Sequence, residues 1–226
     1  MQKIRVAING FGRIGRAFFK LAQEYPELEI VAINDLGDEE QLAYLLQYDT
    51  AYGKSGLEVK TGEGVLTVNG KDIAFLQQKD PAQLPWKDLQ VDVALESTGF
   101  FATYEGSKLH LDAGAKRVVI SAPVKGDPVA GIESATVLMG VNTSELNTCQ
   151  ISSNGSCTTN ASSPVIQVLH ETVGIEKAIL NTVHGYTATQ STQDRPSKDR
   201  RRGRAAAQNI IPTTTGAAIA VTKAIP

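Results

Sequence analysis

Residues 7–16, with the sequence AINGFGRIGR, constrain this chain more than any other feature does. They hold three glycines in GxGxxG spacing between a strand-like apolar run and a helical pattern. In such a turn Gly10 permits the tight bend, Gly12 lets the backbone approach a pyrophosphate, and Gly15 lets the helix pack closely on the strand. The segment therefore predicts a strand–turn–helix unit of the Rossmann type that binds a dinucleotide.

Asp35 is the acidic residue expected at the end of the second strand of such a unit, because it lies 20 residues after Gly15. Its carboxylate can accept hydrogen bonds from the ribose hydroxyls of an adenosine and would repel a 2′-phosphate. The first helical turn, near Arg13 and Ile14, offers backbone N–H groups and the positive end of the helix dipole to a pyrophosphate. We therefore expect NAD as the cofactor.

The rest of the first half alternates short apolar runs with helical patterns, which is typical of βαβ units in a mostly parallel sheet. The pattern predicts strands at Ile4–Ile8, Leu28–Ile33, Val91–Leu95, Arg117–Ile120 and Thr136–Met139, and helices at Ile14–Glu24, Asp38–Gln47 and Glu105–Ala113. The dipeptide Asn69-Gly70 between two further apolar runs indicates a hairpin. We therefore expect a small antiparallel insertion near residues 57–77.

The character of the chain changes near residue 155, where polar residues lead into a helical pattern. A strand-like run follows at Ala178–His184, and an apolar helical run at Ala217–Ile225 ends the chain. Between them lies a long polar segment, Gly185–Arg204. A segment of this kind in a compact domain is usually functional or part of an interface.

Cys157 lies where the helix after residue 155 is predicted to begin, and a helix N-terminus favours the nucleophilic thiolate. His184 ends the following strand-like run. A strand after a helix can return to the helix's first turn, so the two side chains can meet as a nucleophile and its base. From spacing alone, however, a cysteine and a histidine at such a distance are more often unrelated. Cys149 is expected to be a buried strand residue. His110 and His170 lie in helical patterns without chemical neighbours, which favours structural roles.

Composition and pattern exclude several other classes. The net charge of −2 gives no overall field that favours nucleic acid or a membrane surface. No run of apolar residues is long enough to predict a membrane span, and the first residues show no signal-peptide pattern. Two cysteines and three histidines provide no metal-ligand spacing. We expect a cytoplasmic protein with no disulfide, no metal, no membrane partner and no nucleic-acid partner.

Several specific motifs occur in the same order as in a known family and run along the whole chain. They are Ile8–Arg16, Asn34–Leu36, Tyr48–Thr50, Glu96–Phe101, Ile120–Pro123, Ser153–Asn160, His184–Thr187 and Asn209–Ala218. With these motifs the chain resembles the phosphorylating, NAD-dependent glyceraldehyde-3-phosphate dehydrogenases. The resemblance implies a glycolytic enzyme that oxidises glyceraldehyde 3-phosphate to 1,3-bisphosphoglycerate while NAD is reduced. The reaction would run through a thiohemiacetal and a thioester on a cysteine, with inorganic phosphate cleaving the thioester.

The resemblance also implies roles for individual residues, with Cys157 as the nucleophile and His184 as the base that activates it. Besides the three glycines, the positions that match cofactor contacts are Arg13, Ile14, Asp35, Lys79, Ser97, Thr98 and Ser121. The positions that match the binding of substrate phosphate and inorganic phosphate are Ser156, Thr158, Thr187, Arg201, Thr215 and Gly216.

A basic cluster in the polar segment is compatible with a solvated face or a nucleic-acid patch. Its members are Lys198, Arg200, Arg201, Arg202 and Arg204. The segment resembles the S-shaped loop of the family, here called the S-loop. We therefore favour anion binding by Arg201 and subunit contacts by the other residues, and the resemblance implies a homotetramer.

The expected fold is α/β: a Rossmann-type doubly wound parallel sheet domain followed by an incomplete α+β catalytic domain. Residues 1–155 would form the NAD-binding domain, and residues 156–226 a partial catalytic domain that includes the S-loop. About a third of the family's chain is absent after Pro226, so we expect a fragment. Erythrose-4-phosphate dehydrogenase and an inactive NAD-binding fragment remain alternatives. Arg195 leaves the degree of NADP tolerance open.

Overall fold

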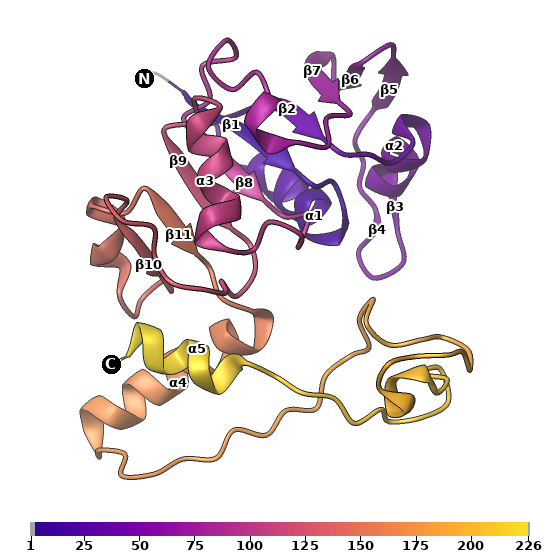
Figure 1. The fold of residues 1–226 in the computed structure, drawn as a ribbon. Coiled ribbons are helices and arrows are strands. Elements are labelled where there is room, and N and C mark those ends of the chain that lie inside the picture. Colours follow the sequence, from indigo (N-terminus) through magenta and orange to yellow (C-terminus); the bar gives the residue numbers. More distant parts are fainter. Residues whose placement is uncertain (1–2, 226) are drawn as a thin grey trace. The chain divides into compact units, whose positions relative to one another are not determined.

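The structure, a computed structural model, describes residues 3–225. The chain divides after Ser156 into two compact units (Figure 1). The N-terminal unit contains every strand of the described residues, and the C-terminal unit contains two α-helices and a long segment without regular structure. Among the described residues, no helix has the length and apolar character needed to cross a bilayer.

A nine-stranded sheet in the order β10-β11-β9-β8-β1-β2-β7-β6-β5 forms the centre of the N-terminal unit (Figure 1). Its strands are β1 (Ile4–Asn9), β2 (Leu28–Asn34), β5 (Val59–Gly62), β6 (Val65–Val68), β7 (Lys71–Leu76), β8 (Val93–Glu96), β9 (Arg117–Ile120), β10 (Ser134–Thr136) and β11 (Ile151–Ser153). All neighbours from β10 to β7 are parallel, whereas β5, β6 and β7 pair antiparallel. The predicted α/β fold with a large parallel sheet is confirmed.

Helices connect the parallel strands, and polar side chains define where two of them begin. They are α1 (Arg13–Ala22), α2 (Glu39–Gln47) and α3 (Tyr104–Asp112). The side chains of Asp38 and Thr103 cap α2 and α3 by accepting from backbone N–H groups three residues on, each at 2.9 Å. Shorter elements complete the unit: 3₁₀ turns η1 (Pro81–Gln83) and η2 (Thr143–Asn147), and a separate hairpin of β3 (Tyr48–Asp49) and β4 (Gly53–Lys54).

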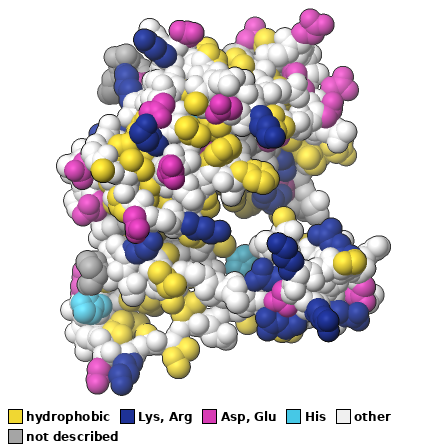
Figure 2. Space-filling view, viewed as in Figure 1, with side chains coloured by type: hydrophobic (Ala, Val, Ile, Leu, Met, Phe, Trp, Pro, Cys, Tyr) yellow, Lys and Arg dark blue, Asp and Glu magenta, His cyan; other side chains and the backbone are white. Residues whose placement is uncertain are grey.

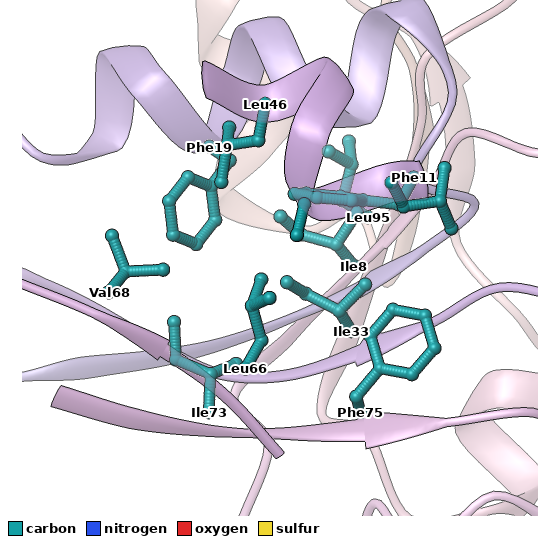
Figure 3. Packing of buried hydrophobic residues seen from close by; sticks show 12 residues of the cluster. Ile8, Phe11, Phe19, Ile33, Leu46, Leu66, Val68, Ile73, Phe75 and Leu95 are labelled. Carbon is teal, nitrogen blue, oxygen red and sulfur yellow. The ribbon is translucent and has the colours of Figure 1, made fainter. Parts of the chain in front are cut away.

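Successive residues of the central strands face opposite sides of the sheet, as the period of a strand requires. On one side Ile8 and Ile33 are fully buried and pack with Phe19 of α1 and Leu46 of α2 (Figure 3). Each of these side chains is removed from water, which stabilises the fold by about 1.5–3 kcal/mol per side chain. The apolar spacing seen in the sequence therefore fixes which face of each helix lies on the sheet.

The opposite side of the same strands carries small residues. They are Ala7, Ala32 and Ala94, each 0% exposed. Their small size leaves room for the indole of Trp86, which is also fully buried on this side. The ring of Trp86 stacks on His110 of α3, with 6.3 Å between ring centroids. This face of the sheet thus encloses polar as well as apolar side chains.

The C-terminal unit consists of α4 (Cys157–Thr172), the 3₁₀ turn η3 (Arg200–Gly203) and α5 (Ala217–Ala224). Helices α4 and α5 pack against each other. The strand predicted at Ala178–His184 is wrong, because these residues form no strand. Ile179 is 97% exposed and Val183 is 91% exposed, and no described strand pairs with them. A strand needs a neighbour to accept and donate its backbone hydrogen bonds, and the apolar run cannot satisfy those groups alone.

The strand predicted at Thr136–Met139 is shorter and earlier than expected, since β10 ends at Thr136. The chain turns there because the side-chain oxygen of Asn142 accepts from the backbone N–H of Leu138 at 2.9 Å. The same amide donates to the carbonyl of Thr136 at 2.9 Å. A local side chain thus replaces the ladder partner that a longer strand would have used. Cys149 also lies just outside a strand, before β11, although it is buried as expected.

Replacement of Gly15 by alanine is predicted to destabilise the N-terminal unit by about 1–3 kcal/mol. A Cβ at this position of α1 would overlap the carbonyl oxygen of Gly10, so the helix or the turn has to move. Gly12→Ala is the matched control, because no other heavy atom lies within 4 Å of its would-be Cβ. Urea unfolding of both variants measures the difference, and equal midpoints would contradict the close packing of α1 on the turn.

Candidate functional site

The order of the strands changes direction at β1, because β2 and β7 lie on one side of it while β8 and β9 lie on the other. Ligands of open α/β sheets bind at such a switch point, outside the carboxyl ends of the strands. In this unit the residues at the switch point are the glycine turn after β1 and Ser97 and Thr98 after β8. The topology therefore places predicted cofactor positions from two distant parts of the sequence beside each other.

Gly10 makes the closest approach between these two turns. Its φ is +96°, which L side chains rarely adopt, and a Cβ there would lie 2.6 Å from the backbone nitrogen of Thr98. The turn is held by hydrogen bonds on both sides: the N–H of Gly10 donates to the carbonyl of Asn34 at 2.8 Å, and the hydroxyl of Ser97 donates to the carbonyl of Gly10 at 2.7 Å. The predicted contact residue Ser97 thus also positions the turn.

Gly12 and the first turn of α1 leave room for a ligand. Gly12 is exposed, and no side chain caps the N-terminus of α1. The uncapped N–H groups and the dipole of the helix favour an anion at this end. The guanidinium of Arg13 is held by Asp49 at 2.8 Å, whereas Ile14 is 52% exposed. This open glycine before an uncapped helix fits the pyrophosphate of a dinucleotide.

Asp35 lies directly after β2, and both of its carboxylate oxygens already accept backbone hydrogen bonds. Oδ2 accepts from the N–H of Phe11 at 2.6 Å, and Oδ1 accepts from the N–H of Gly37 at 2.8 Å. A carboxylate has about four lone-pair sites, so both oxygens keep capacity for ribose hydroxyls. Asp35 therefore fits the role of the ribose acid and also ties the glycine turn to β2.

The remaining predicted cofactor positions lie at the same edge of the sheet. Lys79 is exposed and follows β7, and Ser121 follows β9. The backbone N–H of Ser121 donates to the carbonyl of Glu96 at 2.9 Å, which keeps the end of β9 level with the end of β8. All predicted cofactor residues thus come from strand ends or from the first turn of α1.

The C-terminal unit brings Cys157 and His184 together although 27 residues separate them in sequence. The Sγ of Cys157, the first residue of α4, lies 3.1 Å from the Nε2 of His184. The Nδ1 of His184 lies 2.7 Å from the carbonyl oxygen of Gly185, which can only accept, so Nδ1 carries a proton and donates it. Nε2 is therefore the atom that takes or returns the thiol proton.

The two side chains shift each other's ionisation in the directions expected of an ion pair. Burial raises the pKa of Cys157, but the hydrogen bond and charge of His184 and the hydrogen bonds from Thr158 outweigh it and lower this pKa below its ordinary value. The carbonyl of Gly185 raises the pKa of His184, and Cys157 raises it further. Together these shifts favour a thiolate beside an imidazolium, which is the nucleophilic form of the pair.

The predicted phosphate-binding residues come from separate segments of the chain. Thr187 donates its backbone N–H to the side-chain oxygen of Gln190 at 2.6 Å. The hydroxyl of Thr215 accepts from the N–H of Ala217 at 3.1 Å and so lies at the start of α5, beside Gly216. Thr158 follows Cys157 in the first turn of α4, whereas Ser156 ends the N-terminal unit.

Residues 187–206, which hold all of the S-loop except its first two residues, form a closed segment. Its two arms meet where Ser191 bridges to Ala205 and where Arg195 donates its backbone N–H to the carbonyl of Gly203 at 2.9 Å. An ion pair of 2.6 Å between Asp194 and Arg204 adds to this closure. Figure 2 shows that Lys and Arg side chains gather on this segment.

The predicted phosphate ligand Arg201 is engaged within the S-loop itself. Its guanidinium donates to both oxygens of Asp199, at 2.9 and 3.0 Å. Its neighbour Arg202 donates to the hydroxyl of Thr214 at 2.9 Å, and its Nε is buried without a hydrogen-bond partner. A guanidinium beside the residues that lead into α5 is suited to bind an anion, although the Nε of Arg202 itself lies 3.9 Å from the carboxylate of Asp199. Sequence reasoning missed Arg202 because every arginine of a basic run gives the same signal.

Sequence reasoning also missed a buried polar cluster in the N-terminal unit. His110 was expected to lack chemical neighbours, and this is wrong: its ring contacts both Glu96 and Trp86. All three side chains are at most 1% exposed. The sequence signal that could have found this cluster is a glutamate placed directly after the apolar run Val91–Leu95, because a carboxylate next to a buried strand needs partners. Among the described residues, no group of His, Cys, Asp and Glu could hold a metal ion.

Comparison with known families finds a match in each of the two units. Residues 4–104 match the family model described as glyceraldehyde 3-phosphate dehydrogenase, NAD binding domain, and residues 156–226 match the model of the C-terminal domain of the same family. The N-terminal unit therefore contains the NAD-binding domain of that family, and its open glycine turn, uncapped helix and Asp35 fit the cofactor.

Curated relatives carry the same family name. Over 220 residues the chain is 51% identical to the glyceraldehyde-3-phosphate dehydrogenase of Thermotoga maritima, an alignment that covers 96% of the chain and 64% of the relative. It is 47% identical to the enzyme of Geobacillus stearothermophilus and 48% identical to glyceraldehyde-3-phosphate dehydrogenase 1 of Bacillus subtilis, each over 99% of the chain and 65% of the relative. The chain thus spans somewhat less than two thirds of the length of these relatives.

Gly12→Ala is predicted to weaken NAD binding by about tenfold while leaving the stability of the N-terminal unit unchanged. The added methyl group meets no atom of the protein but occupies the space that the pyrophosphate requires. Calorimetric titration with NAD measures the affinity and urea unfolding the stability. Unaltered affinity in this variant would place the pyrophosphate elsewhere.

Cys157 is predicted to react with iodoacetamide at neutral pH much faster than Cys149. Burial raises the pKa of the Cys149 thiol, whereas His184 lowers that of Cys157. In His184→Asn the pH midpoint of alkylation of Cys157 moves upward, and its rate at neutral pH falls by up to about tenfold for each unit of that shift. Mass spectrometry of each cysteine-containing peptide follows both reactions. His170→Asn, on the exposed side of α4, is the control and leaves the profile unchanged.

Proposed function

Because this chain belongs to the glyceraldehyde 3-phosphate dehydrogenase family, we propose that it acts in the oxidation of glyceraldehyde 3-phosphate to 1,3-bisphosphoglycerate, a step of glycolysis. The observation that carries the proposal is the distance of 3.1 Å between the Sγ of Cys157 and the Nε2 of His184. It supports covalent catalysis, in which a thiolate attacks an aldehyde carbon. When bound, NAD supplies the hydride acceptor of the oxidation.

Cys157 is the nucleophile of the proposed reaction. Its thiolate forms a bond to the carbonyl carbon of the aldehyde, and the carbonyl oxygen takes the proton held on the Nε2 of His184 and becomes the hydroxyl of a thiohemiacetal. The Nε2 of His184 takes the hydroxyl proton as the carbon is oxidised, which leaves a thioester on the sulfur. The other ring proton stays on Nδ1, which donates it in a hydrogen bond to the carbonyl of Gly185. This bond holds the ring in the orientation that the proton transfer needs.

Inorganic phosphate completes the reaction by attacking the thioester carbon. The carbon–sulfur bond breaks, the acyl phosphate leaves, and the thiolate of Cys157 is regained. The residues proposed to bind the phosphate groups are Ser156, Thr158, Thr187, Arg201, Thr215 and Gly216. Arg202, which contacts Thr214, adds one more basic side chain near them. Hydroxyls, helix N-termini and guanidinium groups are the ligands that phosphate prefers.

The domain division supports the same proposal. We propose that residues 1–155, with the antiparallel insertion near residues 57–77, hold NAD, and that residues 156–226 belong to the catalytic domain. The cofactor contacts would come from Gly10, Gly12, Arg13, Ile14, Gly15, Asp35, Lys79, Ser97, Thr98 and Ser121. By likeness to the family we also propose a homotetramer in the cytoplasm, with subunit contacts through the S-loop.

An activity assay tests the proposal. The chain is extended at Pro226 with the residues that follow the aligned region in the Thermotoga maritima relative, and NADH formation is measured with glyceraldehyde 3-phosphate, NAD and phosphate. We expect turnover that depends on phosphate, and loss of at least about 10³-fold in Cys157→Ser, as for removal of a nucleophile.

Two comparisons make the assay specific. Erythrose 4-phosphate replaces the substrate in a parallel reaction, and a higher kcat/KM for it would overturn the proposed substrate. The 226-residue chain without the extension is assayed beside the longer one. Absence of NADH formation in the extended protein, although it binds NAD, would contradict the proposed activity.

A further inference from the structure

A buried carboxylate lies behind the two turns of the NAD site, and neither the proposed mechanism nor the cofactor contacts use it. Glu96, the last residue of β8, is 1% exposed, although glutamate is seldom fully buried without a partner. Four side chains buried in the same unit are linked to it. Asn9 at the end of β1 and His110 of α3 contact it directly, whereas Asn34 at the end of β2 and Trp86 are linked through Asn9 and His110. Together they form a continuous hydrogen-bonded chain.

The direction of each hydrogen bond in this chain follows from the chemistry of its members. The indole Nε1 of Trp86 is only a donor, so the Nδ1 of His110, 3.0 Å away, is its acceptor. The ring proton of the neutral His110 is then on Nε2, which donates to the Oε2 of Glu96 at 3.1 Å. Trp86 thereby selects the tautomer of His110 that stabilises a negative charge on Glu96.

A second branch reaches the same oxygen from the other side of β1. The amide of Asn9 donates to the Oε2 of Glu96 at 2.6 Å, and its own oxygen accepts from the amide of Asn34 at 2.7 Å. Asn34 is fixed in turn by the backbone of Gln78, through bonds of 2.8 and 2.9 Å. Both branches therefore present donors to Oε2 of Glu96, and such donors favour the ionised carboxylate.

The other oxygen of Glu96 holds the turn that faces the glycines. Oε1 accepts the backbone N–H of Thr98 at 2.8 Å and also the hydroxyl of Thr98. The backbone of Thr98 in turn limits the position of Gly10, whose would-be Cβ lies 2.6 Å from it. A displacement of Glu96 therefore changes both turns at the switch point of the sheet at once.

We propose that Glu96 is a positioning residue for NAD, which sets the turns at Thr98 and Gly10, and that His110 of α3 and Trp86, in the turn after η1, hold it in place. The inference rests on the assignment of NAD to these turns. Glu96 does not touch the ligand in this role: it acts through the backbone of Thr98. A carboxylate with four donors gives a unique arrangement that an apolar residue of similar size does not impose.

Glu96→Gln tests the role of the carboxylate, because the amide keeps the shape but presents N–H groups where the neighbours also donate. We expect NAD to bind about tenfold more weakly in calorimetric titration, since a buried donor loses its acceptor. His110→Leu, which removes the donor to Oε2, is expected to weaken binding to a similar extent. His110→Gln can restore a donor to Oε2 and is expected to keep the affinity of the unaltered chain.

Val118→Ala is the matched control for a loss of stability alone. Val118 is buried in β9 beside β8 and takes no part in the polar chain. Urea unfolding, followed by the emission of Trp86, the single tryptophan of the chain, shows whether the variants are folded and how stable they are. We expect Val118→Ala to unfold at a lower urea concentration with unchanged NAD affinity.

Each outcome has one meaning in this design. Unaltered NAD affinity in Glu96→Gln or His110→Leu overturns the positioning role, as does an equal loss of affinity in Val118→Ala at matched stability. Failure of the unaltered chain to bind NAD counts against the cofactor site itself rather than against Glu96. If Glu96→Gln does not fold, the comparison of His110→Leu with His110→Gln decides the question.

Discussion

The backbone of Gly10 lies against the backbone of Thr98, and the N-terminal unit depends on this contact. The contact is possible only because residue 10 has no side chain and can hold a φ of +96°. It lets β1 and β8 end side by side at the point where the strand order changes direction. The N-terminus of α1, the carboxylate of Asp35 and the turn after β8 consequently face one location, which suits a long, charged cofactor better than a compact apolar ligand.

Two carboxylates hold this arrangement, each in a different way. Asp35 accepts the N–H of Phe11 at 2.6 Å and so ties the glycine turn to β2 from the solvent side. Glu96 lies inside the unit and ties the other turn to β1 and α3 through buried donors. Burial raises the pKa of Glu96, but hydrogen bonds from His110, Thr98 and Asn9 together outweigh burial and lower this pKa below its ordinary value. The carboxylate therefore stays charged at neutral pH. The two turns assigned to NAD are thus held by carboxylates that accept hydrogen bonds from the protein itself.

The reactive pair of the C-terminal unit is built with far fewer constraints. Cys157 begins α4, whereas His184 lies in a segment without regular structure, and both side chains are exposed. Their mutual effect on ionisation depends on a single contact of 3.1 Å and on the carbonyl of Gly185. Charges that water can reach interact weakly, so the geometry of the pair, rather than a low dielectric, favours the thiolate. The catalytic assignment therefore relies on local chemistry within one unit.

Local sequence determined the elements whose signals are contained in neighbouring residues: the glycine turn, the helices with apolar stripes and the hairpin at Asn69-Gly70. The strand predicted at 178–184 is wrong, because a strand also requires a neighbouring strand for its backbone hydrogen bonds, and the sequence of the run does not show whether one is present. Only the tertiary structure decided that His110 is a hydrogen-bond partner of Glu96 and that Arg202, rather than Arg201, contacts the Thr214 hydroxyl. Such contacts join residues far apart in the chain, and their energies depend on burial and orientation, which a pattern of residue types does not contain.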